Sequence, residues 1–285
     1  MQPEVRQLQP REQRQRRQII FLLDVSASMR AADPAPSRLT FAKKIIRKTI
    51  AKLEGDQFGL IVFSNYPYLQ CPLTEDEKAF EQLLELASPE QFANQGTEFR
   101  GALQLLASGL ERLKNPRPGR YGVLLTDGGA FDENYKSALI RLRELNVPVI
   151  PVPIGTERGA RIPLPTSDAP RGTDESAGSR GFVRDETGTV VISKLETELL
   201  NALAEEFSTP LIKGDRPETI AETLAKHLRQ KAGFVQRERK GTAEYVPAFK
   251  WITLIGILFL LLGPLPLSFQ TDRKIPLFRA RKRKS

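Results

Sequence analysis

Residues 18–28 read QIIFLLDVSAS and give the clearest indication of the fold. Residues 18–23 are apolar and rich in strand-forming side chains, a pattern typical of a parallel strand that is buried on both faces. The strand pattern ends at Asp24, and serines stand at positions 26 and 28. Because ligands of open parallel sheets bind beyond the carboxyl ends of the strands, this stretch also predicts where a binding site lies.

Outward from this strand, further strand patterns alternate with amphipathic helix patterns. Pro67 and Pro72 restrict one of the strands, 66–72, to an edge of the sheet. The alternation predicts a doubly wound α/β fold, a mostly parallel sheet with helices on both faces. The other expected strands are 57–63, 121–126 and 148–154, and the expected helices are 37–54 (with Ser37 as N-cap), 75–87, 97–113, 133–145, 196–206 and 217–232.

Composition excludes several classes of protein. With 40% hydrophobic and 27% charged residues, the 285-residue chain is not disordered throughout. Cys71 is the single cysteine and His227 the single histidine, which rules out an intrachain disulfide, a thiolate or histidine-cluster metal site, and most Ser-His or Cys-His catalysis.

The net charge of +9 is concentrated near the two ends of the chain. Basic ends that flank an apolar segment are more typical of membrane topology than of a nucleic-acid groove, so nucleic acid is not an expected partner. The basic residues concerned are Arg6, Arg11, Arg14, Arg16 and Arg17, and then Arg273, Lys274, Arg279, Arg281, Lys282, Arg283 and Lys284.

The C-terminal apolar segment, 249–269, has about the 20 residues needed to cross a bilayer. Lys250 and Trp251 suit its interfacial end, and a transmembrane helix is favoured over a buried core helix. The predicted organisation is a basic N-terminal segment (1–17), an α/β domain (18–212), a helical juxtamembrane segment (213–248), the transmembrane helix (249–269) and a basic tail (270–285).

Within the α/β domain, residues 157–193 are predicted to form an inserted loop and hairpin. From Glu157 to Arg184 the composition shifts to Gly, Pro, Ser and charge, which favours a disordered insertion over an exposed recognition element. Residues 182–193 resemble a hairpin that turns at residues 186–188.

Five oxygen-bearing residues are predicted to converge at one edge of the sheet. If 66–72 is the third strand, 121–126 is the fourth and lies across the crevice from the first. Carboxylate and hydroxyl oxygens suit a hard cation, Mg²⁺ above all, with Mn²⁺ or Ca²⁺ as alternatives. Each fragment alone is also common as a turn or a helix cap. The predicted metal ligands are Asp24, Ser26, Ser28, Thr97 and Asp127.

In this order and on these elements, the motif resembles the metal-ion-dependent adhesion site of von Willebrand factor A domains, over roughly residues 18–209. In that family the serines and the threonine contact the metal directly, and the aspartates do so directly or through water. The resemblance implies a protein-binding module whose partner supplies an acidic residue to the metal. Gln95 stands where a second glycine is usual before the threonine, and Gly129 where an acidic residue often follows Asp-Gly.

A narrower resemblance is to the bacterial Bat (aerotolerance-type) membrane proteins. It is carried by Ile154-Gly155-Thr156, the hairpin that leads into Ser193-Lys194-Leu195, and a final helix before the membrane segment. The resemblance implies partners such as a MoxR-type AAA+ ATPase and other membrane proteins of the A-domain type. It also implies an inner-membrane location. By the positive-inside tendency the basic C-terminal tail favours the cytoplasm, so the A domain is expected outside it. An apolar hairpin that precedes this sequence would be consistent with that side, whereas a complete chain would favour a cytoplasmic A domain.

Two other functions remain open. A haloacid dehalogenase-like phosphatase also has an aspartate after its first strand, but it normally needs a second acid where Ser26 stands. A structural assembly subunit would use the metal only for stability. The expected function is binding and not catalysis.

Overall fold

The computed structural model describes residues 16–92, 96–113, 119–129, 135–165 and 181–231. The chain divides into two units, 1–235 and 236–285, and all described residues belong to the first unit. The predicted membrane helix and basic tail therefore lie outside the described residues. Among the helices that are described, none is both long and apolar enough to cross a membrane.

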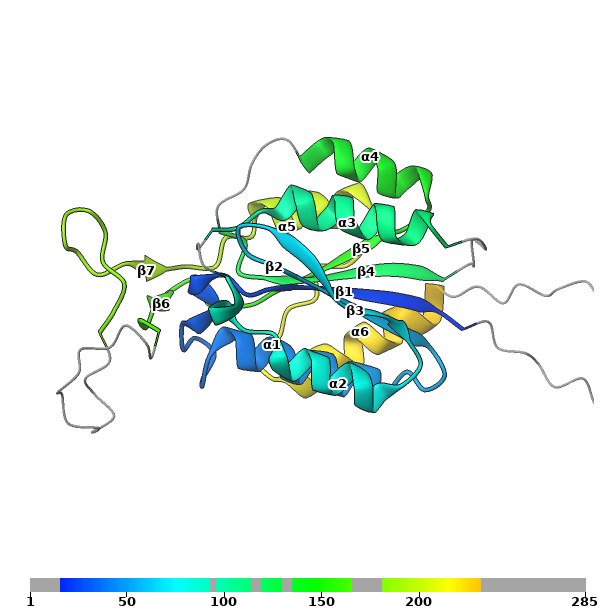
Figure 1. The fold of residues 1–285 in the computed structure, drawn as a ribbon, viewed down its shortest axis with the longest axis horizontal. Helices are drawn as coiled ribbons and strands as arrows, with labels where there is room; N and C mark the ends of the chain where they lie inside the picture. The colour runs from blue at the N-terminus through cyan, green and yellow to red at the C-terminus, as the bar shows by residue number, and fades with distance from the viewer. Residues whose placement is uncertain (1–15, 93–95, 114–118, 130–134, 166–180, 232–285) are drawn as a thin grey trace, which may run out of the picture. The chain divides into compact units, whose positions relative to one another are not determined.

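A five-stranded sheet forms the centre of the first unit (Figure 1), and its strand order is β3-β2-β1-β4-β5. β1 pairs in parallel with β2 and β4, β4 pairs in parallel with β5, and β3 is an antiparallel edge strand, as its prolines require. The predicted α/β fold with a mostly parallel sheet is confirmed. The strands are β1 (Gln18–Asp24), β2 (Gln57–Phe63), β3 (Pro67–Thr74), β4 (Arg120–Thr126) and β5 (Val149–Pro153).

Helices cover both faces of the sheet (Figure 1). One layer consists of α1 (Arg38–Ile50), α2 (Glu77–Leu86) and α6 (Pro217–Lys231), and the other of α3 (Phe99–Glu111), α4 (Lys136–Glu144) and α5 (Glu198–Glu206). Two short 3-10 helices, η1 (Ala27–Arg30) and η2 (Pro89–Gln91), were not predicted from the sequence.

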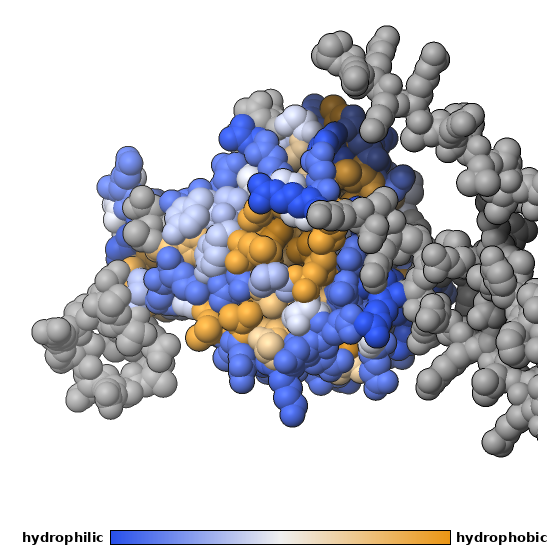
Figure 2. All heavy atoms as spheres, turned by 45° about the vertical axis from the view of Figure 1, so that its right-hand side comes forward, coloured by the Kyte–Doolittle hydropathy of each residue, from blue (hydrophilic) through white to orange (hydrophobic). Residues whose placement is uncertain are grey.

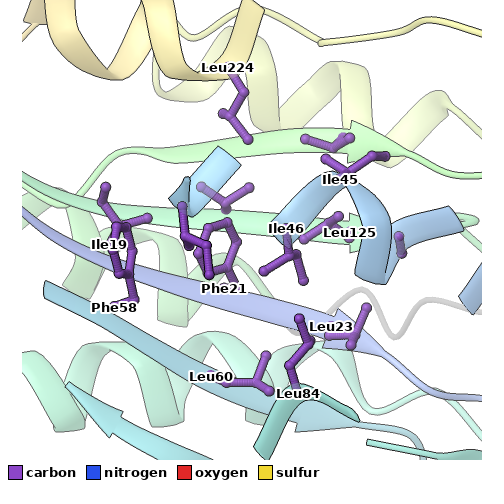
Figure 3. Close-up of a cluster of buried hydrophobic side chains, with 14 of the residues drawn as sticks. Ile19, Phe21, Leu23, Ile45, Ile46, Phe58, Leu60, Leu84, Leu125 and Leu224 are labelled. Atoms are coloured by element: carbon purple, nitrogen blue, oxygen red, sulfur yellow. The ribbon is translucent and has the colours of Figure 1, made fainter. Parts of the chain in front are cut away.

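The alternating side chains of β1 divide the core into two clusters. Phe21 and Leu23 point into the cluster beneath α1, α2 and α6, which Figure 3 shows with Ile45 and Ile46 of α1. Leu22 points to the opposite face, toward α3, α4 and α5. Burial on both faces explains why this strand has no polar alternation in the sequence.

The edge strand β3 bounds the sheet on one side. Figure 2, a view from a second direction, shows hydrophobic residues gathered near the middle of the visible face, with hydrophilic residues above and below them. Leu69 on β3 has an exposed fraction of 48%. Pro67 and Pro72 lack the N–H that an added strand would bond, so they limit further pairing at this edge.

A small two-stranded extension, here called the arm (described residues 157–165 and 181–195), projects from the body on the side where β1 and β4 end (Figure 1). Its strands β6 (Ala160–Arg161) and β7 (Ile192–Ser193) pair antiparallel. A bridge between Arg184 and Val190 flanks a turn near the predicted position. The prediction of a disordered insertion is wrong for residues 160–161, because β7 supplies them with a partner that lies far along the chain. Residues 166–180 lie outside the described residues.

Helix α1 begins where the sequence predicts, because Ser37 Oγ accepts a hydrogen bond from Thr40 N at 3.1 Å. We expect Ser37→Ala to lower the free energy of unfolding by about 1 kcal/mol, the usual cost of losing such a cap. Urea denaturation measures the change. Ser108→Ala, within α3, is the matched control and is expected to be near neutral, since alanine is the better helix former. Equal losses in both variants would argue against the cap.

Candidate metal centre

Asp24 is the last residue of β1 and is fully buried. Its Oδ1 accepts a hydrogen bond from Ser26 N at 2.8 Å, and the hydroxyls of Ser26 and Ser28 are 3.0 Å apart. Ser26 is the N-cap of η1, but its side chain makes no capping hydrogen bond. The explanation of this motif as a simple helix cap therefore fails, and the two serine hydroxyls lie together beside the carboxylate.

Asp127 follows β4 directly, on the strand next to β1. Leu23 is in register with Leu125, so the sheet places the two aspartates at the carboxyl ends of adjacent strands, as the topology argument predicts. Thr126 Oγ1 donates to Asp24 Oδ2 at 2.5 Å. Burial and the negative charge of Asp127 together raise the pKa of Asp24 to about 7. Two carboxylates that repel each other in the interior create a demand for positive charge.

Thr97 is placed at the same edge by Ser64, the residue after β2. Ser64 Oγ donates to Gly96 O at 2.9 Å, and Glu98 N donates to Ser64 O at 2.5 Å, so both neighbours of Thr97 are attached to Ser64. β2 itself ends beside Asp24, which is in register with Phe63. The N-cap of α3 is Glu98, which accepts from Gly101 N, so capping does not account for Thr97 either.

The residues present fit a hard divalent cation. Within the described part of the chain, no three histidine, cysteine, aspartate or glutamate side chains form a metal cluster, so a cation here depends on hydroxyl oxygens as well as on Asp24 and Asp127. Asn65, next to Ser64, has a buried side-chain oxygen without a hydrogen-bond partner, which leaves an acceptor near this edge for a bound water. Oxygen donors with two carboxylates are the set that Mg²⁺ prefers.

Arg38 lies beside the site as a fully buried side chain, and no sequence motif identified it as a functional residue. Its Nη1 donates to Asp127 Oδ2 at 2.7 Å, and its Nε and Nη2 donate to the two carboxylate oxygens of Asp33 at 2.9 and 3.0 Å. A cation in the first turn of a helix opposes the helix dipole. That unfavourable position, five residues after Asp33, was the available indication that Arg38 has carboxylate partners.

The raised pKa of Asp24 predicts how stability and metal binding depend on pH. Between about pH 4 and pH 7 the folded metal-free protein holds a proton that the unfolded chain, with an ordinary Asp pKa, has released, so stability falls as pH rises through this window. A cation needs the deprotonated form. We expect the rise in melting temperature caused by Mg²⁺ to be larger at about pH 8 than at about pH 5.

Differential scanning fluorimetry across this pH range, with and without Mg²⁺, tests the prediction. Asp24→Asn is the control, because the amide keeps the shape of the side chain and does not titrate. A pH profile of the metal-free protein that is the same in both proteins would contradict the assignment of the titration to Asp24.

Comparison with known proteins agrees with this geometry. Residues 19–130, which include all five predicted ligands, match the model of the von Willebrand factor type A domain. This part of the chain is therefore similar to a von Willebrand factor A domain. Its β1-to-Asp24 run, the loop before α3 and the end of β4 are the three parts of the A domain that carry the predicted ligands.

Several relatives resemble more of the chain than the A-domain match covers. BatB from Bacteroides thetaiotaomicron superposes with a TM-score of 0.67 at 26% identity, covering 76% of this chain and 98% of that one. An aerotolerance-related membrane protein from Bacteroides fragilis gives a TM-score of 0.65 at 28% identity, covering 75% and 99%. The resemblance to Bat proteins is confirmed.

Some relatives are considerably longer than the region that they share with this chain. A UPF0353 protein from Mycolicibacterium paratuberculosis is 31% identical over 157 residues, which are 51% of this chain and 47% of that protein. The chain spans about half the length of the first curated relatives it matches.

Proposed function

We propose that the A domain is a binding module that captures an acidic side chain of a partner protein through a divalent cation, with Mg²⁺ as the first candidate. The proposed ligands are Asp24, Ser26, Ser28, Thr97 and Asp127. The observation that carries the proposal is the buried pair Asp24 and Asp127 beside the adjacent hydroxyls of Ser26, which makes no capping bond, and Ser28. In this set the aspartates supply negative charge to the cation, and the hydroxyls supply neutral oxygen ligands.

The chemistry of this donor set favours recognition over catalysis. When bound, a cation held largely by neutral hydroxyls stays electron-poor and accepts a carboxylate as a further ligand. The chain's own part is to orient the oxygens: Ser26 N fixes one oxygen of Asp24 and Thr126 fixes the other. Ser26 stands where a phosphatase of this sheet type needs its general acid, which is why we propose that the chain is not an enzyme.

We further propose that the chain works at a membrane, in a bacterial envelope complex. The similarity to an aerotolerance-related membrane protein and the apolar segment 249–269 support membrane attachment. A MoxR-type AAA+ ATPase and other A-domain membrane proteins are the partners that we propose on the resemblance to Bat proteins. An extracytoplasmic A domain is part of the same proposal.

Direct cation binding tests the core of the proposal. We expect the detergent-solubilised full-length chain to bind Mg²⁺ in calorimetry, and Asp24→Ala to weaken the binding by at least about tenfold, since removal of one charged ligand costs well over 1 kcal/mol. Asp215→Ala is the matched control, because Asp215 is an exposed aspartate. Equal affinity in wild type and Asp24→Ala would sink the assigned site.

Recognition is tested separately from cation binding. Wild-type chain in Mg²⁺, wild-type chain in EDTA and Asp24→Ala are used as bait in a native membrane extract. Proteins that only the first bait retains support capture through the metal. The same retention by all three baits, at temperatures where each is folded, would favour the assembly-subunit alternative, in which the metal only stabilises the domain.

A further inference from the structure

A hydrogen-bond network centred on the buried Arg38 joins α1, the metal centre and the arm. Arg38 Nη1 donates to Ser193 Oγ at 2.6 Å as well as to Asp127 Oδ2, and Arg38 Nη2 donates to Ser193 O at 2.9 Å. Ser193 Oγ in turn donates to Asp127 Oδ2 at 3.2 Å. Ser193 is the last residue of β7, so a side chain and a carbonyl of the arm are part of the hydrogen-bond shell of a predicted metal ligand.

The backbone that leaves the arm is attached to the same loop. Glu196 N donates to Asp127 O at 2.9 Å. The approach at the next residue is so close that a Cβ on Gly128 would lie 1.8 Å from Glu196 O. Residues 193–196 therefore contact Asp127 at both its carbonyl and its carboxylate.

The start of the arm is held by the other partner of Arg38. Asp33 Oδ2 accepts hydrogen bonds from Thr156 N at 3.2 Å and from Thr156 Oγ1 at 2.8 Å, in addition to its bond from Arg38. Thr156 O accepts from Leu195 N at 3.0 Å, which joins the two ends of the arm. The residues at both ends of the arm are therefore hydrogen-bonded to the same cluster, which consists of the buried guanidinium of Arg38 and the carboxylates of Asp33 and Asp127.

We propose that Arg38 is a positioning residue that couples the arm to the metal centre, so that a change in the conformation of the arm changes the affinity for the cation. The inference rests on the proposed function and adds its regulation. Arg38 and Ser193 occupy Asp127 Oδ2, and the other oxygen, Oδ1, accepts only the longer bond from Gly129 N at 3.2 Å among the described contacts. A carboxylate held in this way is preorganised for a cation, because its side-chain freedom is already lost before binding.

Because of thermodynamic linkage, the coupling can be measured either as a change in cation affinity or as a change in the stability of the arm. If cation binding stabilises the arm, an intact arm strengthens cation binding by the same factor. Ser193→Ala removes the hydroxyl that bonds to both Arg38 and Asp127, and it changes no charge and leaves the direct Arg38–Asp127 pair in place. We expect this variant to bind Mg²⁺ about fivefold more weakly, at the lower end of coupling between sites. In the wild type, we expect Mg²⁺ to slow amide hydrogen exchange in peptides that cover 190–196, again by about fivefold.

The experiment is Mg²⁺ calorimetry and hydrogen exchange on the full-length chain and three variants. Ser193→Thr keeps a hydroxyl and is expected to restore most of the affinity, which excludes a general folding defect as the cause. Ser108→Ala makes the same chemical change within α3 and is expected to bind as the wild type does.

The outcomes separate this inference from the proposed function. A wild type that binds Mg²⁺ without slower exchange at 190–196, or a Ser193→Ala variant with wild-type affinity, overturns the coupling and leaves the metal site standing. A wild type that binds no Mg²⁺ rejects both. Slower exchange together with weaker binding by Ser193→Ala and recovery in Ser193→Thr supports the coupling.

Discussion

Arg38→Ala is expected to lower the free energy of unfolding by about 3–5 kcal/mol, the range found when one partner of a buried ion pair is removed. Arg38 is fully buried, and it bonds to the carboxylates of Asp33 and Asp127. In the variant the buried carboxylate of Asp127 loses the guanidinium that pairs with it, and the carboxylate of Asp33 loses its bidentate partner. The variant also loses the hydrogen bonds from Arg38 to Ser193. Chemical denaturation of the metal-free protein measures the loss.

The matched control for this variant is on the same helix. Arg47 pairs with Glu85 at the surface, where the two side chains are 38% and 63% exposed. We expect Arg47→Ala to cost less than about 1 kcal/mol, because water screens and replaces such a pair. Similar losses from Arg38→Ala and Arg47→Ala would mean that burial of the Arg38 network contributes nothing. Saturating Mg²⁺ should recover part of the Arg38→Ala loss, since the cation supplies charge to Asp127.

Gly128→Ala is the second large expected effect, with a loss of about 2–5 kcal/mol in the free energy of unfolding. Gly128 has a φ of +81°, a conformation that costs an L-residue about 1–2 kcal/mol. The added Cβ would also meet the carbonyl of Glu196 at 1.8 Å, so the backbone that leaves the arm has to move. Overpacking against backbone adds about 1–3 kcal/mol. Thermal and urea unfolding measure the total.

Gly188 provides a control that separates the two causes. It has the same φ of +81°, and a Cβ built on it meets nothing within 4 Å. We expect Gly188→Ala to cost only the conformational term, about 1–2 kcal/mol. The difference between the two variants measures the close approach of Glu196 to Gly128. Equal losses would show that this contact gives way without cost. Gly128→Ala is also expected to weaken Mg²⁺ binding, since Glu196 N bonds to Asp127 O.

Local chemistry explains most of what could be predicted from the sequence. A strand that is buried on both faces needs a continuous apolar run, and residues 19–23 form one. Pro67 and Pro72 exclude a central strand whatever the tertiary fold. Ser37 caps a helix with atoms only three residues away. The position of Asp24 and Asp127 follows from strand ends and strand order, so the set of candidate ligands could also be predicted from the sequence.

Tertiary structure alone decided the roles of Arg38, Ser193 and the arm. Arg38 and Ser193 are 155 residues apart in the chain, and Arg38 and Asp127 are 89 apart, so no local pattern relates them. β6 and β7 have two residues each, which is too short for any periodicity, and they exist because they pair with each other. The α/β fold and the oxygen-rich edge could be predicted from local sequence patterns, because backbone geometry and solvent exclusion act over a few residues. Which charges meet in the interior was decided only by folding, since a buried guanidinium must find carboxylates wherever the chain brings them.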